Sequence, residues 1–230
     1  GKLQGLDLSR VPPLVKAAAG IDVTIAGGVT TPEDLAALDR LGADAQVGMA
    51  IYTGRLDVGD AFAAPLVSDR PDGLWPTVVV DESGQSLGLV YSNGESLRAA
   101  VAEGRGIYWS RRRGLWRKGE TSGQTQELLR IEADCDRDAL KFTVRQAGGG
   151  FCHLGTRSCW GTAGGLDDLA RRLADRCQDA PAGSYTARLF AEPWLLAAKL
   201  REEADELAAA TGKKDVIWET ADVLYFALVA

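Results

Sequence analysis

Two stretches of regular alternation in the middle of the chain most constrain its fold. In residues 129–134 and again in residues 140–145, apolar side chains alternate with charged or hydroxyl-bearing ones. Because successive side chains of a strand point to opposite faces, each stretch predicts a strand with one apolar and one wet face. The apolar faces are formed by Leu129, Ile131, Ala133, Leu140, Phe142 and Val144.

The same segment contains a hairpin pattern further upstream. Residues 77–80 and 87–91 are apolar stretches separated by a short polar turn, which predicts two antiparallel strands. Ser92 with Glu95 forms a capping-box pattern for a short helix. Residues 72–163 are therefore expected to form an α+β domain on a mainly antiparallel sheet.

Residues 1–66 have a different pattern, that of β/α units. The apolar strand at 23–26 runs into Gly27 and Gly28, and a proline-containing helix start follows at 31–34. Glycines where a strand gives way to a helix let backbone N–H groups approach a phosphate, but they also form ordinary tight turns. Spacing alone leaves both interpretations open.

Residues 164–230 are expected to be all-helical. The first helix carries its apolar residues on one side. Cys177 near the end of this helix is predicted to be a buried or inert thiol. Gly212 separates two later helices. The apolar residues expected to pair the later helices are Leu196, Leu200, Leu207, Ile217, Ala221, Leu224, Tyr225 and Leu228.

Composition narrows the functional classes. Apolar residues make up 46% of the 230, and the net charge of −6 gives no general electrostatic reason to bind nucleic acid. No apolar run approaches the roughly 20 residues of a membrane helix. Four cysteines without a secretory segment favour reduced thiols and a cytoplasmic location. The polar start and apolar end suggest a piece of a longer protein.

An acidic run follows the first alternating stretch. Asp134, Asp136 and Asp138 alternate, so an extended segment would present them on one side and Cys135 on the other. Three carboxylates on one face suit a hard cation such as Mg²⁺ or Ca²⁺. An EF-hand loop is excluded, because Ala139 stands where that motif needs glycine.

Three cysteines add a softer set of ligands. Cys135 and Cys152 are 17 residues apart, and Cys159 lies seven residues further on. This spacing lacks the paired thiols of a structural zinc finger and indicates an open, catalytic zinc site. His153, the single histidine, is a candidate proton shuttle. A solvated acidic turn beside core cysteines remains the alternative.

Residues 106–123 combine cations, hydroxyls, glycines and indoles. Arginine forks bind phosphate, and aromatic faces stack on bases, so this loop is predicted to hold a small phosphorylated ligand. An exposed basic hairpin or a nucleic-acid patch is the alternative. The predicted substrate-binding residues are Trp109, Ser110, Arg111, Arg113, Lys118, Glu120, Thr121, Ser122 and Gly123, with Lys118 also a catalytic candidate.

The last two helices carry a second set of carboxylates. Glu202 and Glu206 are four residues apart on one helix face, where like charges destabilise a helix by roughly 0.2–0.5 kcal/mol unless a cation is shared. A solvated acidic face is the alternative. Glu219 and Asp222 are three residues apart on the second helix, so one cation could be shared by the two helices.

The motifs of the middle segment together resemble the phosphoribosyl-AMP cyclohydrolase family. They are Trp109-Ser110-Arg111, the run 115–123, Asp134–Asp138 and the run 152–159. The resemblance implies zinc on Cys135 of one subunit and on Cys152 and Cys159 of its dimer partner. It also implies magnesium on Asp134, Asp136 and Asp138, and hydrolytic opening of an adenine ring.

The flanking segments carry resemblances of their own. The pattern 202–206 followed by 219–222 resembles phosphoribosyl-ATP pyrophosphohydrolase, although the final helix of that family is expected to be missing. This resemblance implies magnesium on Glu202, Glu203, Glu206, Glu219 and Asp222. Ala26-Gly27-Gly28-Val29 and the run 48–54 resemble the end of the (β/α)₈ barrel isomerases of histidine biosynthesis. This order is similar to that of the multifunctional histidine-biosynthesis proteins of fungi.

We therefore expect three segments: a partial β/α barrel remnant at 1–66, a cyclohydrolase-like domain at 72–163 and pyrophosphohydrolase-like helices at 164–230. The implied function is a bifunctional hydrolase that releases pyrophosphate from phosphoribosyl-ATP and then opens the ring of phosphoribosyl-AMP. It would be a homodimer using Zn²⁺ and Mg²⁺, with no nucleic-acid or membrane partner. The alternative is a nucleotide-binding regulatory module with degenerate helices.

Overall fold

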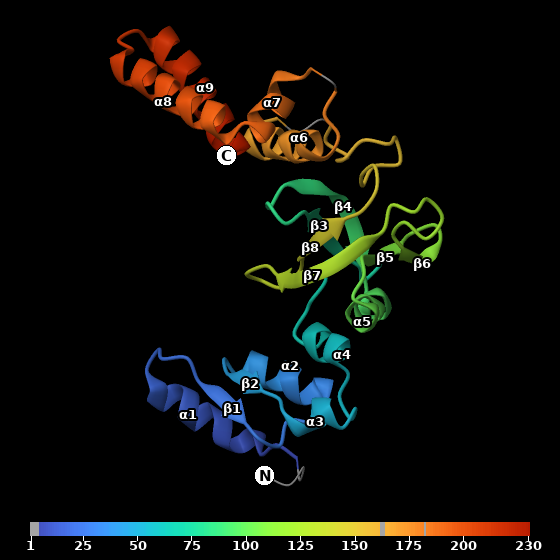
Figure 1. Ribbon diagram of the computed structural model, residues 1–230. Helices are drawn as coiled ribbons and strands as arrows, with labels where there is room; N and C mark the ends of the chain where they lie inside the picture. Colours follow the sequence, from blue (N-terminus) through green and yellow to red (C-terminus); the bar gives the residue numbers. More distant parts are fainter. Residues whose placement is uncertain (1–4, 162–163, 182) are drawn as a thin grey trace. The chain divides into compact units, whose positions relative to one another are not determined.

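The computed structural model describes residues 5–161, 164–181 and 183–230 (Figure 1). The chain divides into two compact units, Gly1–Thr162 and Ala163–Ala230. The first unit contains both helices and sheets, and the second is helical. The predicted combination of an α+β region with a helical C-terminal region is thus confirmed.

The N-terminal part of the first unit is a small β/α arrangement around two parallel strands. Thr31 caps the helix between these strands through a complete capping box with Asp34. Two paired strands are not a barrel, and the barrel resemblance of residues 1–66 stays a prediction. The elements are a 3₁₀ turn η1 (Leu8–Arg10), α1 (Val11–Ala18), β1 (Thr24–Ala26), α2 (Pro32–Arg40), β2 (Asp44–Gln46), α3 (Met49–Tyr52) and α4 (Val58–Ala63).

A four-stranded sheet forms the centre of the first unit. Its order is β4-β3-β8-β7, with antiparallel outer pairs and a parallel β3–β8 pair in the middle. Helix α5 and the two-stranded β5–β6 sheet complete this part (Figure 1). The bounds are β3 (Trp75–Val80), β4 (Ser86–Ser92), α5 (Gly94–Glu103), β5 (Ile107–Ser110), β6 (Gly114–Arg117), β7 (Gln126–Ala133) and β8 (Leu140–Gln146).

The burial of residues on β7 and β8 can be compared with the alternation expected from the sequence. On β8, Leu140, Phe142 and Val144 are all buried, as expected. On β7 the expectation is wrong at Leu129, which is 41% exposed, whereas Leu128 packs against the core. The register of β7 against β8 shifts between Leu128 and Arg130. A bulge inserts one extra residue there, so Leu128 before it and Ile131 and Ala133 after it pack against the core, while Leu129 is left outside.

The start of α5 differs from the predicted capping box by one residue. The cap is Asn93, whose side chain accepts the N–H of Ser96, and Ser96 returns a hydrogen bond to the backbone of Asn93. Ser92 belongs to β4, where its buried hydroxyl accepts a hydrogen bond from Thr77 at 2.8 Å. The prediction failed because Ser92 is already paired within the sheet.

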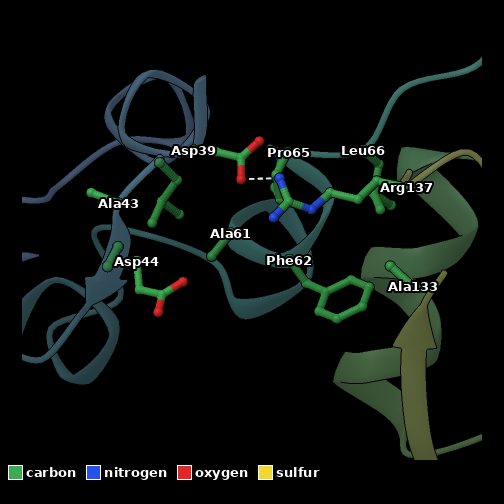
Figure 2. Close-up of a pocket in the computed structure, with 11 residues that line it drawn as sticks. Asp39, Ala43, Asp44, Ala61, Phe62, Pro65, Leu66, Ala133 and Arg137 are labelled. Carbon is green, nitrogen blue, oxygen red and sulfur yellow. Dashed lines mark ion pairs between the residues drawn. The ribbon is translucent and has the colours of Figure 1, made fainter. Parts of the chain in front are cut away.

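The N-terminal part contacts the sheet through α4 and the turn after β7. Arg98 on α5 pairs with Asp60 at 2.7 Å, and the N–H of Val67 donates to the carbonyl of Arg137 at 3.0 Å. Figure 2 shows the guanidinium of Arg137 paired with Asp39 beside a cavity of about 310 Å³. The turn that follows β7 is therefore held from outside the sheet.

In the described residues of the second unit, 164–181 and 183–230, four helices surround a small core. Its buried residues are Leu173, Leu189, Phe226 and Val229. The helices are α6 (Leu166–Gln178), α7 (Tyr185–Ala191), α8 (Pro193–Ala209) and α9 (Lys213–Val229). Among the described residues, no helix is long and apolar enough to cross a membrane.

Two expectations for this unit are wrong in part. Cys177 is exposed, so it is not buried, and Leu173 is the buried residue of α6; that the thiol is inert stays a prediction. Of the residues expected to pair the later helices, Leu196, Leu200 and Tyr225 pack against the core, whereas Ile217 is 59% exposed and Leu224 is 37% exposed. Within the chain, α9 presents Phe226 to the core instead.

Candidate active sites

The turn between β7 and β8 brings the three aspartates together. It is a tight turn rather than the extended segment predicted, with Arg137 in the left-handed region at φ 66°. Asp134 closes it by accepting the N–H groups of Asp138 and Ala139, each at 3.1 Å. Ligand oxygens of Asp134, Asp136 and Asp138 lie within 4.8 Å of one another. The convergence was predicted correctly, but the geometry behind it was not.

The electrostatics of this acidic turn fit a hard cation. The neighbouring charge of Asp136 raises the pKa of Asp138, with partial burial adding to the effect. The backbone N–H of Ala139 lowers the pKa of Asp134. Since the carboxylates repel each other, a divalent cation bound to their oxygens would relieve that repulsion. The donor set therefore fits magnesium.

Residues 150–159, here called the thiol loop, bring two of the three predicted zinc ligands together. The thiols of Cys152 and Cys159 are close enough to interact. The N–H of Cys152 donates to the carbonyl of Thr156 at 3.0 Å, and the N–H of Cys159 donates to that of Leu87 on β4 at 2.8 Å. The loop thus curls back on itself and is fastened to the sheet.

The two thiols differ in acidity. The backbone N–H of Leu154, followed by the side chain of Thr156, lowers the pKa of Cys152. Partial desolvation, followed by the neighbouring Cys152, raises the pKa of Cys159. The Cys152 thiolate thus forms more readily than that of Cys159, and a cation shared by both sulfurs would favour the second thiolate. Two adjacent thiols are a donor set that fits zinc.

A cavity of about 520 Å³ opens over this pair. It is large enough for a nucleotide-sized ligand. The predicted site residues that line it are Arg113, Lys118, Thr121, Ser122, Cys152, His153 and Cys159. Trp116, Gln124 and Phe151 also line it and were missed, although Trp116 stands in the same motif as Lys118.

Lys118 is the buried cation of this cavity. It is only 5% exposed, its Nζ lies 3.4 Å from the carbonyl oxygen of Gln124, and it sits 5.3 Å from the centre of the Phe151 ring. Burial lowers the pKa of Lys118, while the thiols of Cys159 and Cys152 oppose that shift. The ammonium group is therefore placed beside the thiols, where negative charge from sulfur or phosphate stabilises it.

The other predicted loop residues lie around the cavity rather than on its wall. Ser110 accepts the N–H groups of Arg112 and Arg113 within the β5–β6 turn. The guanidinium of Arg111 lies 4.7 Å from the centre of the Tyr91 ring. Trp109, Glu120 and Gly123 are likewise absent from the lining.

His153, which does line the cavity, is exposed, and its Nδ1 lies 3.9 Å from the sulfur of Cys152.

Cys135, the third predicted zinc ligand, lies elsewhere. It is exposed on the acidic turn and lines a surface cavity with Asp39 and Asp136. In the part of the chain that the structure describes, the groups of three or more metal-ligating side chains are two carboxylate sets, and the three cysteines do not form one. A single chain thus brings together only two of the three thiols.

The second unit contains the other carboxylate set, between α8 and α9. Ligand oxygens of Glu203, Glu206 and Glu219 lie within 4.8 Å of one another. Burial, then the charges of Glu206, Glu203 and Asp222, raises the pKa of Glu219. A shared cation would relieve this repulsion, so the set fits magnesium.

Lys199 on α8 organises the edge of this set. Its Nζ lies 3.0 Å from Glu203 and 2.8 Å from Glu202. Glu202 is exposed and pairs with this lysine instead of joining the three-oxygen group. Asp222 also lies outside that group, although its charge contributes to the raised pKa of Glu219. Two of the five predicted ligands are therefore peripheral.

Two protein families match consecutive parts of the chain. The family described as phosphoribosyl-AMP cyclohydrolase matches residues 88–161, and the family described as phosphoribosyl-ATP pyrophosphohydrolase matches residues 166–230. The trifunctional histidine biosynthesis protein of Neurospora crassa is 46% identical over 224 residues, which cover 97% of this chain and 24% of that protein. That alignment includes the N-terminal part.

Two relatives named as bifunctional proteins also match the chain. The histidine biosynthesis bifunctional protein his7 of Schizosaccharomyces pombe is 53% identical over 174 residues, 76% of this chain and 42% of that protein. The chain thus spans less than half the length of these two fungal relatives. The bifunctional protein HisIE of Shewanella oneidensis is 42% identical over 170 residues, 70% of this chain and 80% of that protein. The chain belongs to this family of histidine-biosynthesis proteins, and along it the match to phosphoribosyl-AMP cyclohydrolase precedes the match to phosphoribosyl-ATP pyrophosphohydrolase.

Proposed function

We propose that the chain performs two consecutive hydrolyses, pyrophosphate release from phosphoribosyl-ATP and then ring opening of phosphoribosyl-AMP. The observation that carries this proposal is the cavity in which Cys152, Cys159 and His153 lie beside the buried Lys118. Paired thiols can bind zinc, an imidazole can transfer protons, and a buried cation can bind phosphate, so together they suit zinc-assisted hydrolysis of a phosphorylated substrate. The separate carboxylate set on α8 and α9 supports the other reaction.

In the first site, Cys152 and Cys159 would hold zinc together with Cys135 of a second copy of the chain. Zinc, when bound, lowers the pKa of water toward ~7 and so supplies the nucleophile at neutral pH. His153, exposed beside the thiols, would move the proton between water and the ring nitrogen. The reaction breaks the bond between N1 and C6 of the adenine ring.

Substrate binding falls to the β5–β6 sheet and the loop after it. Arg113 and Lys118 would pair with phosphate, and Thr121 and Ser122 offer hydroxyls at the same wall. The ring of Trp116 is available for stacking on the base, with Arg113 5.0 Å from its centre. Magnesium on the acidic turn at Asp134–Asp138 would screen the substrate's phosphates.

In the second site, Glu203, Glu206 and Glu219 would hold magnesium, with Glu202 and Asp222 completing the set. This arrangement would neutralise the triphosphate of phosphoribosyl-ATP and orient water for attack. The pairing of Glu202 with Lys199 favours the second candidate, a helical module that binds nucleotides without cleaving them.

Incubation of the chain with phosphoribosyl-ATP, Zn²⁺ and Mg²⁺ tests the proposal. Pyrophosphate is expected to appear first and the ring-opened product second, the latter followed by its ultraviolet absorbance. Omitting Mg²⁺ should stop the first product, since its site is built of carboxylates alone. Tight binding without pyrophosphate release under excess Mg²⁺ would instead establish the regulatory module.

Sharing of the zinc site between two copies has a quantitative signature. Cys135→Ala and Cys152→Ala are each expected to be inactive in ring opening. In a symmetric dimer, random mixing makes half the dimers mixed, and each mixed dimer has one site with all three thiols. Co-refolded variants should therefore regain about a quarter of the wild-type rate. No recovery in verified mixed dimers would place all three thiols of a site in one chain.

A further inference from the structure

We infer that Asp81 is a positioning residue for the thiol loop, and that it acts by holding Arg157 so that Cys152 and Cys159 are preset for a metal ion. This inference rests on the proposed zinc site. Asp81 lies in the turn between β3 and β4, outside the cavity, and nothing in the sequence patterns singles it out. It would act through the loop and not on the substrate.

The Asp81 carboxylate is buried and fixed in orientation. It is 1% exposed, although aspartate usually lies at the surface. One oxygen accepts from the hydroxyl of Ser83 at 2.6 Å and from the N–H of Gln85 at 3.0 Å. The other lies 2.7 Å from a terminal nitrogen of Arg157. The turn thus holds a carboxylate in place for one arginine of the thiol loop.

Arg157 in turn sets the path of the loop. Its carbonyl accepts the N–H of Phe151, the neighbour of Cys152, at 2.9 Å. Gly150 packs so closely that a Cβ there would lie 2.5 Å from the Cα of Arg157. Cys159 follows two residues later. A shift of Arg157 would therefore displace the backbone on both sides of the thiol pair.

Uncharged hydrogen bonds also fasten the loop to the hairpin. Ser158 donates to the carbonyl of Ser86 at 3.0 Å, close to the bond between Cys159 and Leu87. These bonds anchor the end that carries Cys159. The Asp81–Arg157 pair holds the middle of the loop, and the buried Nε of Arg157 has no hydrogen-bond partner among the described residues. Burying that donor is unfavourable, so the charge of Asp81 is needed to offset it.

The test measures metal binding to the whole chain rather than turnover. Co²⁺ is titrated into wild type and Asp81→Asn, and affinity is read from the thiolate-to-cobalt absorption. Asp81→Asn keeps the shape of the side chain but removes the charge that holds Arg157. The expected result is about 10-fold weaker binding, the lower end for groups that orient metal ligands.

The matched control is Glu82→Gln, the adjacent residue with the same change of charge. Glu82 is exposed and pairs with Arg145 on β8, away from the thiol loop. Its affinity for Co²⁺ is expected to match wild type. Arg157→Lys, which retains a cation for Asp81, should bind within about threefold of wild type, whereas Arg157→Gln should resemble Asp81→Asn.

The outcomes separate this inference from the proposed function. If wild type gives no thiolate-to-cobalt absorption, the zinc site itself is wrong and the inference fails with it. If wild type binds and Asp81→Asn binds equally, only the inference is overturned. A lower unfolding temperature of Asp81→Asn with unchanged affinity also overturns it, because the pair would then be merely structural. If Asp81→Asn does not fold, the comparison of Arg157→Lys with Arg157→Gln decides.

Discussion

Replacing Cys152 with serine is expected to lower ring opening of phosphoribosyl-AMP by roughly 10²–10³-fold or more, while pyrophosphate release changes less than about twofold. Losing one thiolate removes a charged ligand of the zinc ion, and the lowered pKa of water depends on that ion. Cys152 is the more acidic thiol of the pair, so its loss should weaken zinc binding most. Both products and bound zinc are measured on the same preparation.

Cys177→Ser is the matched control for this substitution. Cys177 is an exposed cysteine on α6, outside both candidate sites, so the same chemical change there should leave zinc content and both activities unchanged. Equal loss of both activities in folded Cys152→Ser would mean that the two reactions share one site. Retention of zinc with loss of ring opening would mean that Cys152 acts on the reaction and not on the metal.

The sequence was sufficient where a pattern reflects a local rule. Period-two alternation predicted β8 with its buried Phe142, and the threonine-proline start predicted the cap of α2. The same rule failed at Leu129, because a bulge adds a residue without leaving a mark in the hydrophobic pattern. Strand existence was thus readable, and strand register was not.

For the candidate sites, the sequence likewise predicted which residues take part but not how they are arranged. Residue chemistry was enough to select Cys152, Cys159 and the carboxylates, since few other side chains bind these ions. Their arrangement was not readable, because it depends on a turn with Arg137 at positive φ and on contacts between distant segments. Asp81 lies 76 residues from its partner Arg157 and belongs to no recognisable motif. Only the folded chain reveals that pairing.

The apolar surface of α9 illustrates a further limit. Leu224 and Leu228 were expected to help pair the later helices, yet each is 37% exposed while Phe226 is buried. Periodicity identifies an apolar side of a helix but does not say which neighbour covers it. The choice between Phe226 and the leucines is made by packing against Leu173 and Leu189.

Glu219→Gln is expected to lower pyrophosphate release by about 10²-fold and to weaken Mg²⁺ binding, with ring opening unchanged. Glu219 contributes one of three converging carboxylates, and an amide is a poorer and uncharged ligand for a hard cation. Pyrophosphate is followed enzymatically, and Mn²⁺ binding serves as the metal readout. Asp205→Asn on the exposed side of α8, outside the three-oxygen group, is the control and should behave as wild type.

The same substitution should make the metal-free protein more resistant to heat. Burial and the charges of Glu206 and Glu203 raise the pKa of Glu219 above its value in the unfolded chain. A carboxylate with a raised folded-state pKa destabilises the fold at pH values above that pKa, and the effect disappears as the pH falls through it. With EDTA at pH 7 to 8, Glu219→Gln should therefore unfold at a higher temperature than wild type, whereas near pH 4 the difference should shrink. Loss of activity together with a lower unfolding temperature at pH 7 to 8 would attribute the defect to misfolding and would remove Glu219 from the metal site.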